Sequence, residues 1–156
     1  MNCKNCGAAM VLVRDYFACE YCTAFHFPSE STDGVRVLEE GAAVDCPLCQ
    51  LPLSFASLDQ VRVKHCENCR GILVDRRRFA SIVESRRSKY PGREGQQQML
   101  DEVDRRRRVD CPKCKDRMDL HPYYGPGRVM IDTCGHCALI WLDHGELTTI
   151  ARAPGH

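Results

Sequence analysis

The sequence predicts a small metal-bound fold class, with three short β-hairpin units in tandem and a short helix after the second and the third. Three observations lead to this prediction. All 12 cysteines of the 156-residue chain fall into pairs of the form Cys-x-x-Cys, and the residues around these pairs repeat three times. Each repeat is also shorter than a chain that folds around a hydrophobic core alone, so a bound metal is expected to supply much of the folding free energy.

The spacing of the cysteine pairs groups them into three sets of four. The two pairs of a set are separated by 12, 16 and 19 residues in turn, and each interval suits a short hairpin. A tetrahedral zinc ion needs four thiolates, and one Cys-x-x-Cys turn supplies two of them. We therefore expect three bound Zn²⁺ ions per chain and no catalytic residue. The predicted metal ligands are Cys3, Cys6, Cys19 and Cys22; Cys46, Cys49, Cys66 and Cys69; and Cys111, Cys114, Cys134 and Cys137.

A disulfide framework is the first alternative for so many cysteines. The N-terminal stretch "MNCKNCGAAMVLV" has no charged segment followed by a long apolar one, so it does not predict export. Disulfides are rare in reducing compartments, and we expect a cytoplasmic protein with metal sites instead. No apolar run approaches the roughly 20 residues that cross a bilayer, so no membrane contact is expected.

Two redox alternatives remain open. Cys134-Gly-His-Cys137 has the form of a disulfide-exchange dithiol. A redox dithiol of that kind lies at the start of a helix, whereas this one precedes the strand-like run from Ala138 to Leu142. Four cysteines also hold iron, so a rubredoxin-like electron carrier is the other alternative. The identity of the metal separates both from a zinc protein.

Apolar residues recur at matching positions of the three units. They stand four residues after the first pair of each unit and at alternate positions after the second pair. Alternation with a period of two predicts strands with one face turned to a small core. We expect the recurring residues, and Trp141 with them, to form these cores: Met10, Leu53 and Met118; Phe25 and Phe27; Ile72 and Val74; Ile140 and Leu142.

Helices are predicted after the second and third units. The stretches "ILVDRRRFASIV" and "IWLDHGELTTIA" align without a gap and place Asp75 on Asp143. Asp is a favourable N-cap, Glu146 stands at capping-box spacing from Asp143, and apolar residues follow at helical spacing. The prediction is a helix at about residues 76–88 and another at about 144–152.

The third unit contains Cys-Pro-x-Cys at 111–114, Cys-x-x-Cys at 134–137 and then the run Trp-Leu-Asp-x-Gly-Glu-Leu at 141–147. With this pattern it resembles the bacterial zinc-ribbon domain family of the transcription factor IIB type. Ala138 and Leu139 depart from it, because the family usually has a glycine pair there. The second unit is similar but has Leu73 for the tryptophan and Arg77-Arg78 for Gly-Glu, and the first is a generic zinc ribbon that shares only the cysteines. The resemblance implies zinc binding, and ribbons of this kind serve in transcription, translation and unassigned roles. The matching residues of the third unit are Cys111, Pro112, Cys114, Cys134, Cys137, Trp141, Leu142, Asp143, Gly145, Glu146 and Leu147.

The chain divides accordingly into three ribbons and two connectors. The second connector contains "QQQMLDEVDRRRR", read as a linker helix, and the first contains one short strand at about Val35 to Leu38. The expected divisions are zinc ribbon 1 at 1–27, an acidic linker at 28–45, zinc ribbon 2 with its helix at 46–90, a linker with a basic helix at 91–108, and zinc ribbon 3 with its helix at 109–156.

The distribution of charge suggests where partners bind. Residues 76–108 carry 11 basic and 5 acidic side chains, whereas residues 1–45 carry 3 and 7. The formal net charge of +1 becomes about −5 with 12 thiolates and three zinc ions, which disfavours strong nonspecific binding to nucleic acid. We expect a non-enzymatic interaction protein with a protein partner. An adaptor in transcription- or nucleic-acid-related assembly is one role that fits it. The candidate nucleic-acid contacts are Arg76, Arg77, Arg78, Arg105, Arg106, Arg107 and Arg108.

Overall fold

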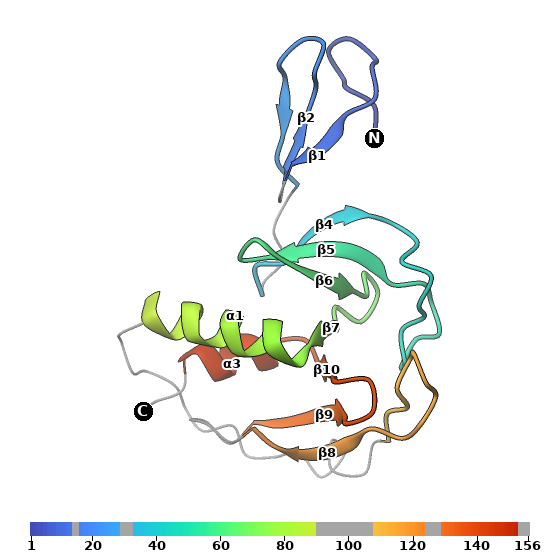
Figure 1. Ribbon diagram of the computed structural model, residues 1–156, viewed down its shortest axis with the longest axis vertical. Coiled ribbons are helices and arrows are strands. Elements are labelled where there is room, and N and C mark those ends of the chain that lie inside the picture. Colours follow the sequence, from blue (N-terminus) through green and yellow to red (C-terminus); the bar gives the residue numbers. More distant parts are fainter. Residues whose placement is uncertain (14–15, 29–32, 90–107, 124–128, 153–156) are drawn as a thin grey trace.

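The computed structural model describes residues 1–13, 16–28, 33–89, 108–123 and 129–152. These residues form three four-cysteine clusters in a β-rich structure with a short helix after the second and the third cluster. The strands make two sheets, one with the order β1-β2-β3 and one with the order β4-β5-β6-β7-β10-β9-β8 (Figure 1). No helix in the described ranges is long and apolar enough to cross a membrane.

The first ribbon is a small antiparallel sheet that pairs only within itself. Its strands are β1 (Val11–Val13), β2 (Tyr16–Ala18) and β3 (Phe25–His26). Phe17, in the middle strand, is only 2% exposed and fills the inner face of the sheet. Figure 1 shows this ribbon standing apart from the larger body, the name used below for the described part of residues 33–152.

The second and third ribbons each contribute three antiparallel strands. They are β5 (Ser54–Leu58), β6 (Val61–His65) and β7 (Ile72–Asp75), and then β8 (Asp119–Pro122), β9 (Met130–Cys134) and β10 (Leu139–Leu142). Asp59 and Gln60 join β5 to β6 with φ angles of 50° and 68°. Two positive φ angles in a two-residue loop are typical of a type I′ turn, which matches the twist of the strands it connects.

The pairing of β7 with β10 merges these two ribbons into one sheet. Leu73 pairs with Trp141, and these are equivalent positions of the two aligned repeats. Antiparallel pairing of equivalent positions places a local two-fold axis between the ribbons. The second and third of the predicted tandem ribbons thus share one sheet, because each last strand is apolar on both faces. Ile72, Leu73 and Val74 are all at most 3% exposed, which requires a neighbour on the open edge as well as on each face.

Two helices cover one face of the merged sheet and pack against each other. They are α1 (Arg76–Lys89) and α3 (Glu146–Arg152). Asp75 caps α1, because its Oδ1 accepts the backbone N–H groups of Arg77 at 2.8 Å and Arg78 at 3.3 Å. The carboxylate of Glu146 accepts the N–H of Asp143 at 2.8 Å, as in a capping box. Helices therefore occur at both predicted places.

Residues 33–45, part of the acidic linker expected at 28–45, belong to the larger body, and the short strand expected at about Val35 to Leu38 is present there. They contribute the edge strand β4 (Arg36–Glu39), which pairs with β5. Val35 and Asp33 are each 1% exposed, and the Asp33 carboxylate accepts the backbone N–H of Gly145 at 2.8 Å near the start of α3. The predicted linker helix falls almost wholly on residues 90–107, outside the described residues.

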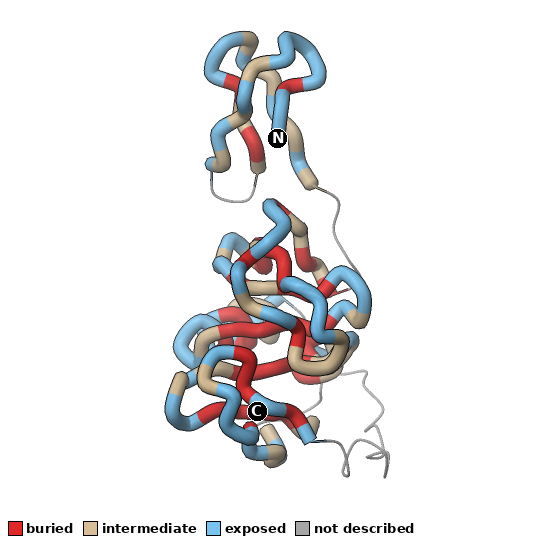
Figure 2. The backbone as a smooth tube through the Cα atoms, turned by 90° about the vertical axis from the view of Figure 1, so that its right-hand side faces the viewer, coloured by how far each residue is buried: buried red, intermediate tan, exposed pale blue. Residues whose placement is uncertain are grey.

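The larger body has a core on each face of its sheet. One lies under the helices, and the other contains Trp141, Leu73 and cysteines of the second and third clusters. Figure 2 shows the buried backbone concentrated in this body. The core prediction is confirmed for Trp141, which is fully buried, but it is wrong for Phe25 and Phe27 of the first ribbon, which are 61% and 59% exposed. A ribbon this small has one inner face, and Phe17 already fills it.

Candidate metal centres

The structure brings the cysteines together in the three sets of four that their spacing predicts. Within each set all four sulfurs lie within 4.8 Å of one another, and all 12 cysteines are free thiols. The Sγ atoms of Cys3 and Cys22 are 3.5 Å apart, and those of Cys46 and Cys69 are 3.7 Å apart. Zinc–sulfur bonds of about 2.3 Å place the sulfurs of a tetrahedral site about 3.8 Å apart, whereas a disulfide requires about 2 Å. The donor sets therefore fit a tetrahedral metal and do not fit a disulfide framework.

All six Cys-x-x-Cys turns share one backbone conformation. In each turn the residue after the second cysteine has a φ between 55° and 78°. The N–H of the first cysteine also returns to a carbonyl five residues later, for example from Cys46 to Leu51 and from Cys111 to Asp116, both at 2.7 Å. This conformation points two sulfurs to one side of the turn. The residues with positive φ are Gly7, Thr23, Gln50, Arg70, Lys115 and Ala138.

Hydrogen bonds to sulfur favour the thiolate form that a metal binds. The backbone N–H groups of Cys49 and Cys137 point at the Sγ atoms of Cys46 and Cys134, both at 3.4 Å. The side-chain amide of Asn68 donates to the Sγ of Cys49 at 3.2 Å, and this bond is the main reason that the pKa of Cys49 lies below its ordinary value.

The thiols of the first cluster differ widely in acidity. The pKa of Cys22 is lowered to about 6, first by the backbone hydrogen bond from Ala24 and then by the side chain of Asn5. The pKa of Cys6 is raised to about 12, because its contacts with the thiols of Cys19 and Cys22 outweigh the backbone hydrogen bond from Ala8. A thiolate on Cys22 is thus stabilised by protonated neighbours, and a metal must displace those protons to bind.

In the second cluster, burial is the largest cause of the raised pKa values of two thiols. It raises the pKa of Cys46 to about 11 and raises the pKa of Cys69 as well. Both thiols are therefore protonated in neutral solution without metal. A buried negative charge is costly, so Cys46 and Cys69 depend on the cation for their thiolate form.

Trp141 joins the second and third centres. Its ring lies against Gly71, where an added Cβ atom would stand only 2.1 Å from the tryptophan Cζ2. Its indole N–H donates to the Asp143 Oδ1 at 3.2 Å, so the polar atom of this buried ring is paired. Gly71 is a residue whose role the sequence analysis missed. The sequence does contain a sign of this role, because the two aligned ribbons differ at this position: the third has Leu139 where the second has Gly71.

The histidines do not join the metal sites in the described part of the chain. The groups of three or more possible ligands found there are the three four-cysteine clusters. His136, between two cysteines of the third cluster, is exposed. His65 precedes Cys66 but is buried, and burial lowers its pKa so that the ring is neutral at pH 7. Neither offers a further ligand or an open coordination position.

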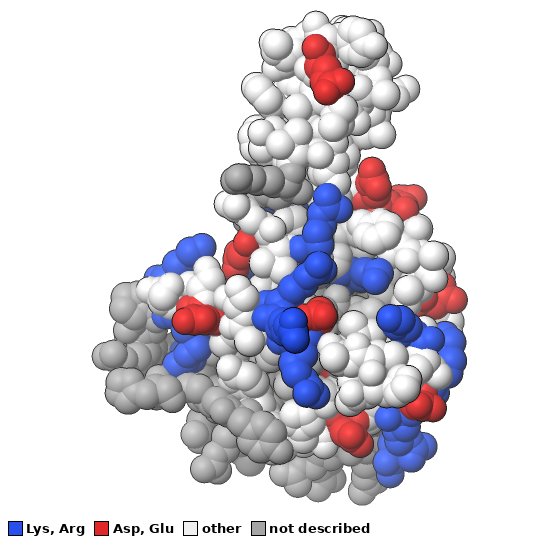
Figure 3. Space-filling model, viewed as in Figure 1, with Lys and Arg blue, Asp and Glu red and all other residues white. Residues whose placement is uncertain are grey.

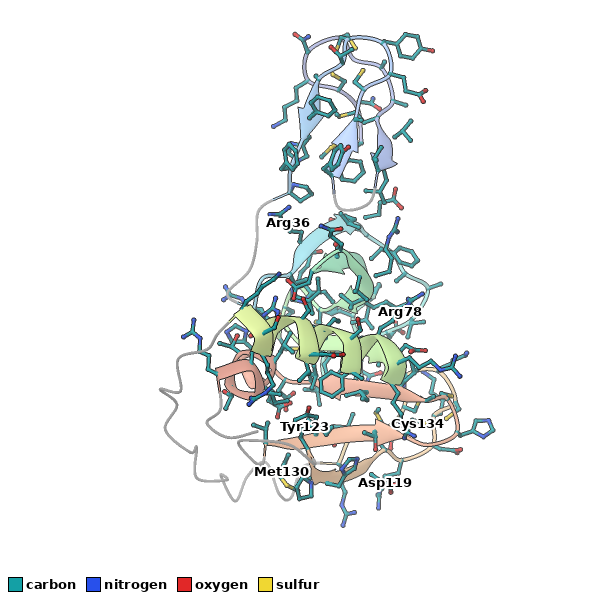
Figure 4. All side chains as sticks on the ribbon, turned by 60° about the vertical axis from the view of Figure 1, so that its left-hand side comes forward. Arg36, Arg78, Asp119, Tyr123, Met130 and Cys134 are labelled. Atoms are coloured by element: carbon teal, nitrogen blue, oxygen red, sulfur yellow. The ribbon has the colours of Figure 1, made fainter. Side chains whose placement is uncertain are left out.

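Three of the candidate arginines gather at the start of α1. Arg76, Arg77 and Arg78 are exposed, and the backbone N–H of Arg76 donates to the carbonyl of Ala138 at 2.9 Å. Figure 4 shows Arg78 and Cys134 at the same end of the larger body, so the arginines lie at the end that holds the third cluster. Basic side chains gather on the face shown in Figure 3. Arg105, Arg106 and Arg107 lie outside the described residues, and Arg108 is exposed.

Comparison with known proteins gives one family. Residues 45–85 and residues 110–153 each match the family described as transcription factor zinc-finger. The two matches contain the second and the third cluster, and the first ribbon lies outside both. No curated protein and no solved structure matches the chain.

Proposed function

Because the chain belongs to the transcription factor zinc-finger family, through two ribbons that span more than half of its length, we propose that it is a zinc-dependent, non-enzymatic interaction protein. In this proposal the three four-cysteine sites each hold one zinc ion as a scaffold. The outer surfaces then bind protein partners or nucleic acid as an adaptor in transcription-related assembly.

The observation that carries the proposal is the complete use of the thiols. All 12 cysteines stand in clusters of four, so a bound zinc ion has four protein ligands at every site. A zinc site with four protein ligands has no open position for water or substrate, unlike a catalytic site with three. The bound metal would supply folding free energy, and the chain's own side chains would form the binding surfaces.

The exposed arginines of α1 support nucleic acid as one partner. Arg76, Arg77 and Arg78 occupy the first turn of the helix, where the helix dipole disfavours cations, and the first turn contains no acidic residue. Arg78 also donates from a guanidinium nitrogen to the backbone carbonyl of Arg62 at 3.3 Å, which leaves its charge at the surface of the sheet. A cationic cluster held at an unfavourable position suits contact with phosphates.

The test is a binding titration with labelled DNA and RNA across a range of salt concentrations. The variant R76E/R77E/R78E is compared with K113E/K115E/R117E, which changes the charge equally at exposed residues of the third ribbon. We expect the first variant to weaken binding. The slope of the logarithm of the binding constant against the logarithm of the salt concentration should fall by the equivalent of about three phosphate contacts. The control variant should bind as the original chain does. Equal loss in both variants would mean that only net charge matters and would reject this site.

Metal analysis tests the scaffold itself and the redox alternatives. We expect native mass spectrometry to find three zinc ions on the purified full chain, without visible absorption. Iron, with its visible colour, would favour the electron carrier. Thiols of Cys134 and Cys137 that react as fast before chelation as after it would favour the dithiol redox protein.

A further inference from the structure

We propose that a band of basic side chains on the larger body binds the sugar–phosphate backbone of double-stranded DNA. The inference rests on the proposed function and deepens it, because it names the nucleic acid and adds strand residues to the arginines of α1. We call this surface the basic band. Its members come from β4, from β6 and from the first turn of α1: Arg36, Arg62, Lys64, Arg76, Arg77 and Arg78.

The strand register places three members of the basic band on one face of the sheet. Arg36 pairs with Ser57, which pairs in turn with Arg62, and directly paired residues share a face. Lys64 follows Arg62 by two positions and so lies on the same face. The residues that alternate with them belong to the core under the helices, so the basic side chains lie on the other face. These core residues are Val35, Ala56 and Val63.

A contact between α1 and β6 joins the helix arginines to the strand residues. A guanidinium nitrogen of Arg78 donates to the backbone carbonyl of Arg62 at 3.3 Å, so the first turn of α1 lies beside β6. Arg76 and Arg77 are exposed in the same turn, and the carboxylate of Asp75 before them caps the helix. Figure 3 shows Lys and Arg side chains in succession from the region of β4 to that of α1, with an acidic group beside them.

The charges of the basic band are not used to hold the fold together. Arg86 and Arg87, later in α1, do serve the fold, because Arg86 donates to the carboxylate of Asp59 at 2.7 Å and Arg87 to the carbonyl of Ile150 at 2.9 Å. Cations gathered at a surface without counter-charges are stabilised by an anionic partner. Five members of the basic band form no ion pair with a carboxylate of the described residues: Arg62, Lys64, Arg76, Arg77 and Arg78.

The surroundings of the basic band favour a duplex backbone over a protein or a single strand. Protein interfaces depend on apolar and aromatic anchors, and single-stranded nucleic acid stacks on aromatic rings. In the described part of the larger body, the large hydrophobic side chain that is exposed is Leu51, which lies outside the band and is not aromatic. Contacts with the phosphates of a duplex need cations alone, and they supply most of the affinity of sequence-independent binding.

The spacing of the strand residues favours DNA over duplex RNA. Arg36 and Arg62 are two strand spacings apart, which is about 10 Å between their Cα atoms. Arginines at this separation suit the phosphates on the two sides of the major groove of B-form DNA, which is about 12 Å wide. The major groove of duplex RNA is narrow, so the same pair of arginines fits it less well.

The probes are a short labelled DNA duplex, a second duplex of unrelated sequence, and the RNA duplex and the DNA single strand of the first sequence. Binding to the full zinc-loaded chain is measured by fluorescence anisotropy across a range of salt concentrations. We expect both DNA duplexes to bind alike, and more tightly than the other two probes. The slope of the logarithm of the binding constant against the logarithm of the salt concentration should be about −5 for six phosphate contacts.

The variant R36Q/R62Q/K64Q removes three charges of the basic band and leaves α1 unchanged. We expect it to weaken duplex binding by at least about tenfold and to reduce the slope by about three contacts. R62Q alone, at an exposed position, should reduce the slope by about one contact. The matched control K113Q/K115Q/R117Q removes three charges at exposed residues of the third ribbon and should bind as the original chain does. Zinc content, measured for every variant, separates a lost surface from a lost fold.

Other outcomes overturn the basic band. Equal loss in R36Q/R62Q/K64Q and the control means that net charge alone acts. If R76E/R77E/R78E weakens nucleic-acid binding and R36Q/R62Q/K64Q does not, the arginine site of the proposed function stands and the band is rejected. Tighter binding of the RNA duplex or of the single strand rejects DNA as the occupant. Polyglutamate that displaces the DNA duplex at equal charge concentration identifies an acidic protein as the partner instead. An original chain that holds its zinc but binds no probe rejects the band and leaves the zinc scaffold intact.

Discussion

At the residue scale, the shared conformation of the cysteine turns explains why the family usually has a glycine where this chain has Ala138. Ala138 follows the last cysteine of the third cluster with a φ of 55°, a region that glycine adopts without strain and other residues adopt at a cost. A glycine at this position is therefore favourable for the turn itself, whatever the ribbon binds. Its five counterparts obey the same backbone rule, and Gly7 is the only glycine among the six.

Gly71 gives a residue-scale prediction about the seam between two ribbons. G71A places a Cβ atom 2.1 Å from the Trp141 ring, so the ring must move. We expect a loss of about 3 kcal/mol in the free energy of unfolding, as for an overpacked core. Denaturant titration checks this through the fluorescence of Trp141, the one tryptophan of the chain. G135A is the control, because no atom lies within 4 Å of the position of its Cβ. Equal stability of both variants would contradict the packing argument.

The acidity of the second cluster predicts how its metal affinity depends on pH. The pKa values of Cys46 and Cys69 are raised by burial, so both thiols hold protons at neutral pH and release them when zinc binds. Affinity then falls as pH falls, by at least about a hundredfold per pH unit, because these two thiols alone release two protons. Competition with a chromophoric chelator at several pH values measures this slope. A slope near zero between about pH 6 and pH 8 would mean that the thiols are already ionised.

At the scale of single elements, local signals predict the helices but not everything that holds them. Asp75 and Glu146 form caps with residues two or three positions away, which a sequence shows directly. Asp33 accepts a hydrogen bond from Gly145, 112 positions further along the chain. An acidic, turn-rich connector gives no local sign of this contact. The sequence predicts the short strand at about Val35 to Leu38 but not its place at the edge of the larger sheet.

Asp33 therefore supports a prediction about α3. D33A removes a buried carboxylate that accepts the Gly145 N–H and the Thr148 hydroxyl, and His144 approaches it at 3.4 Å. We expect a loss of about 2 kcal/mol and faster hydrogen exchange in Glu146–Arg152. Exchange mass spectrometry measures this effect segment by segment. E40A removes an exposed carboxylate of the same connector and should leave α3 protected. Equal exchange in both variants would rule out Asp33 as the support.

At the scale of the whole molecule, the sequence predicts the parts better than their assembly. The cysteine spacing predicts the three clusters, because a short turn and a hairpin bring the ligands together locally. The pairing of β7 with β10 depends on two strands 64 residues apart or more, and either strand alone reads as the last strand of an independent ribbon. The apolar character of both strands on both faces is the sign that they are internal to a larger sheet.

This assembly predicts that the second and third centres depend on each other and that the first does not. Cys46, Cys66, Cys111 and Cys134 share one core cluster with Trp141, whereas the first ribbon pairs only within its own sheet. C46S/C49S should therefore release the metals of two centres and expose the Trp141 ring, and C3S/C6S should release one and leave the ring buried. Native mass spectrometry counts the metals, and tryptophan fluorescence reports the core. If C46S/C49S loses only its own metal and keeps the Trp141 signal, the two ribbons fold independently despite their common sheet.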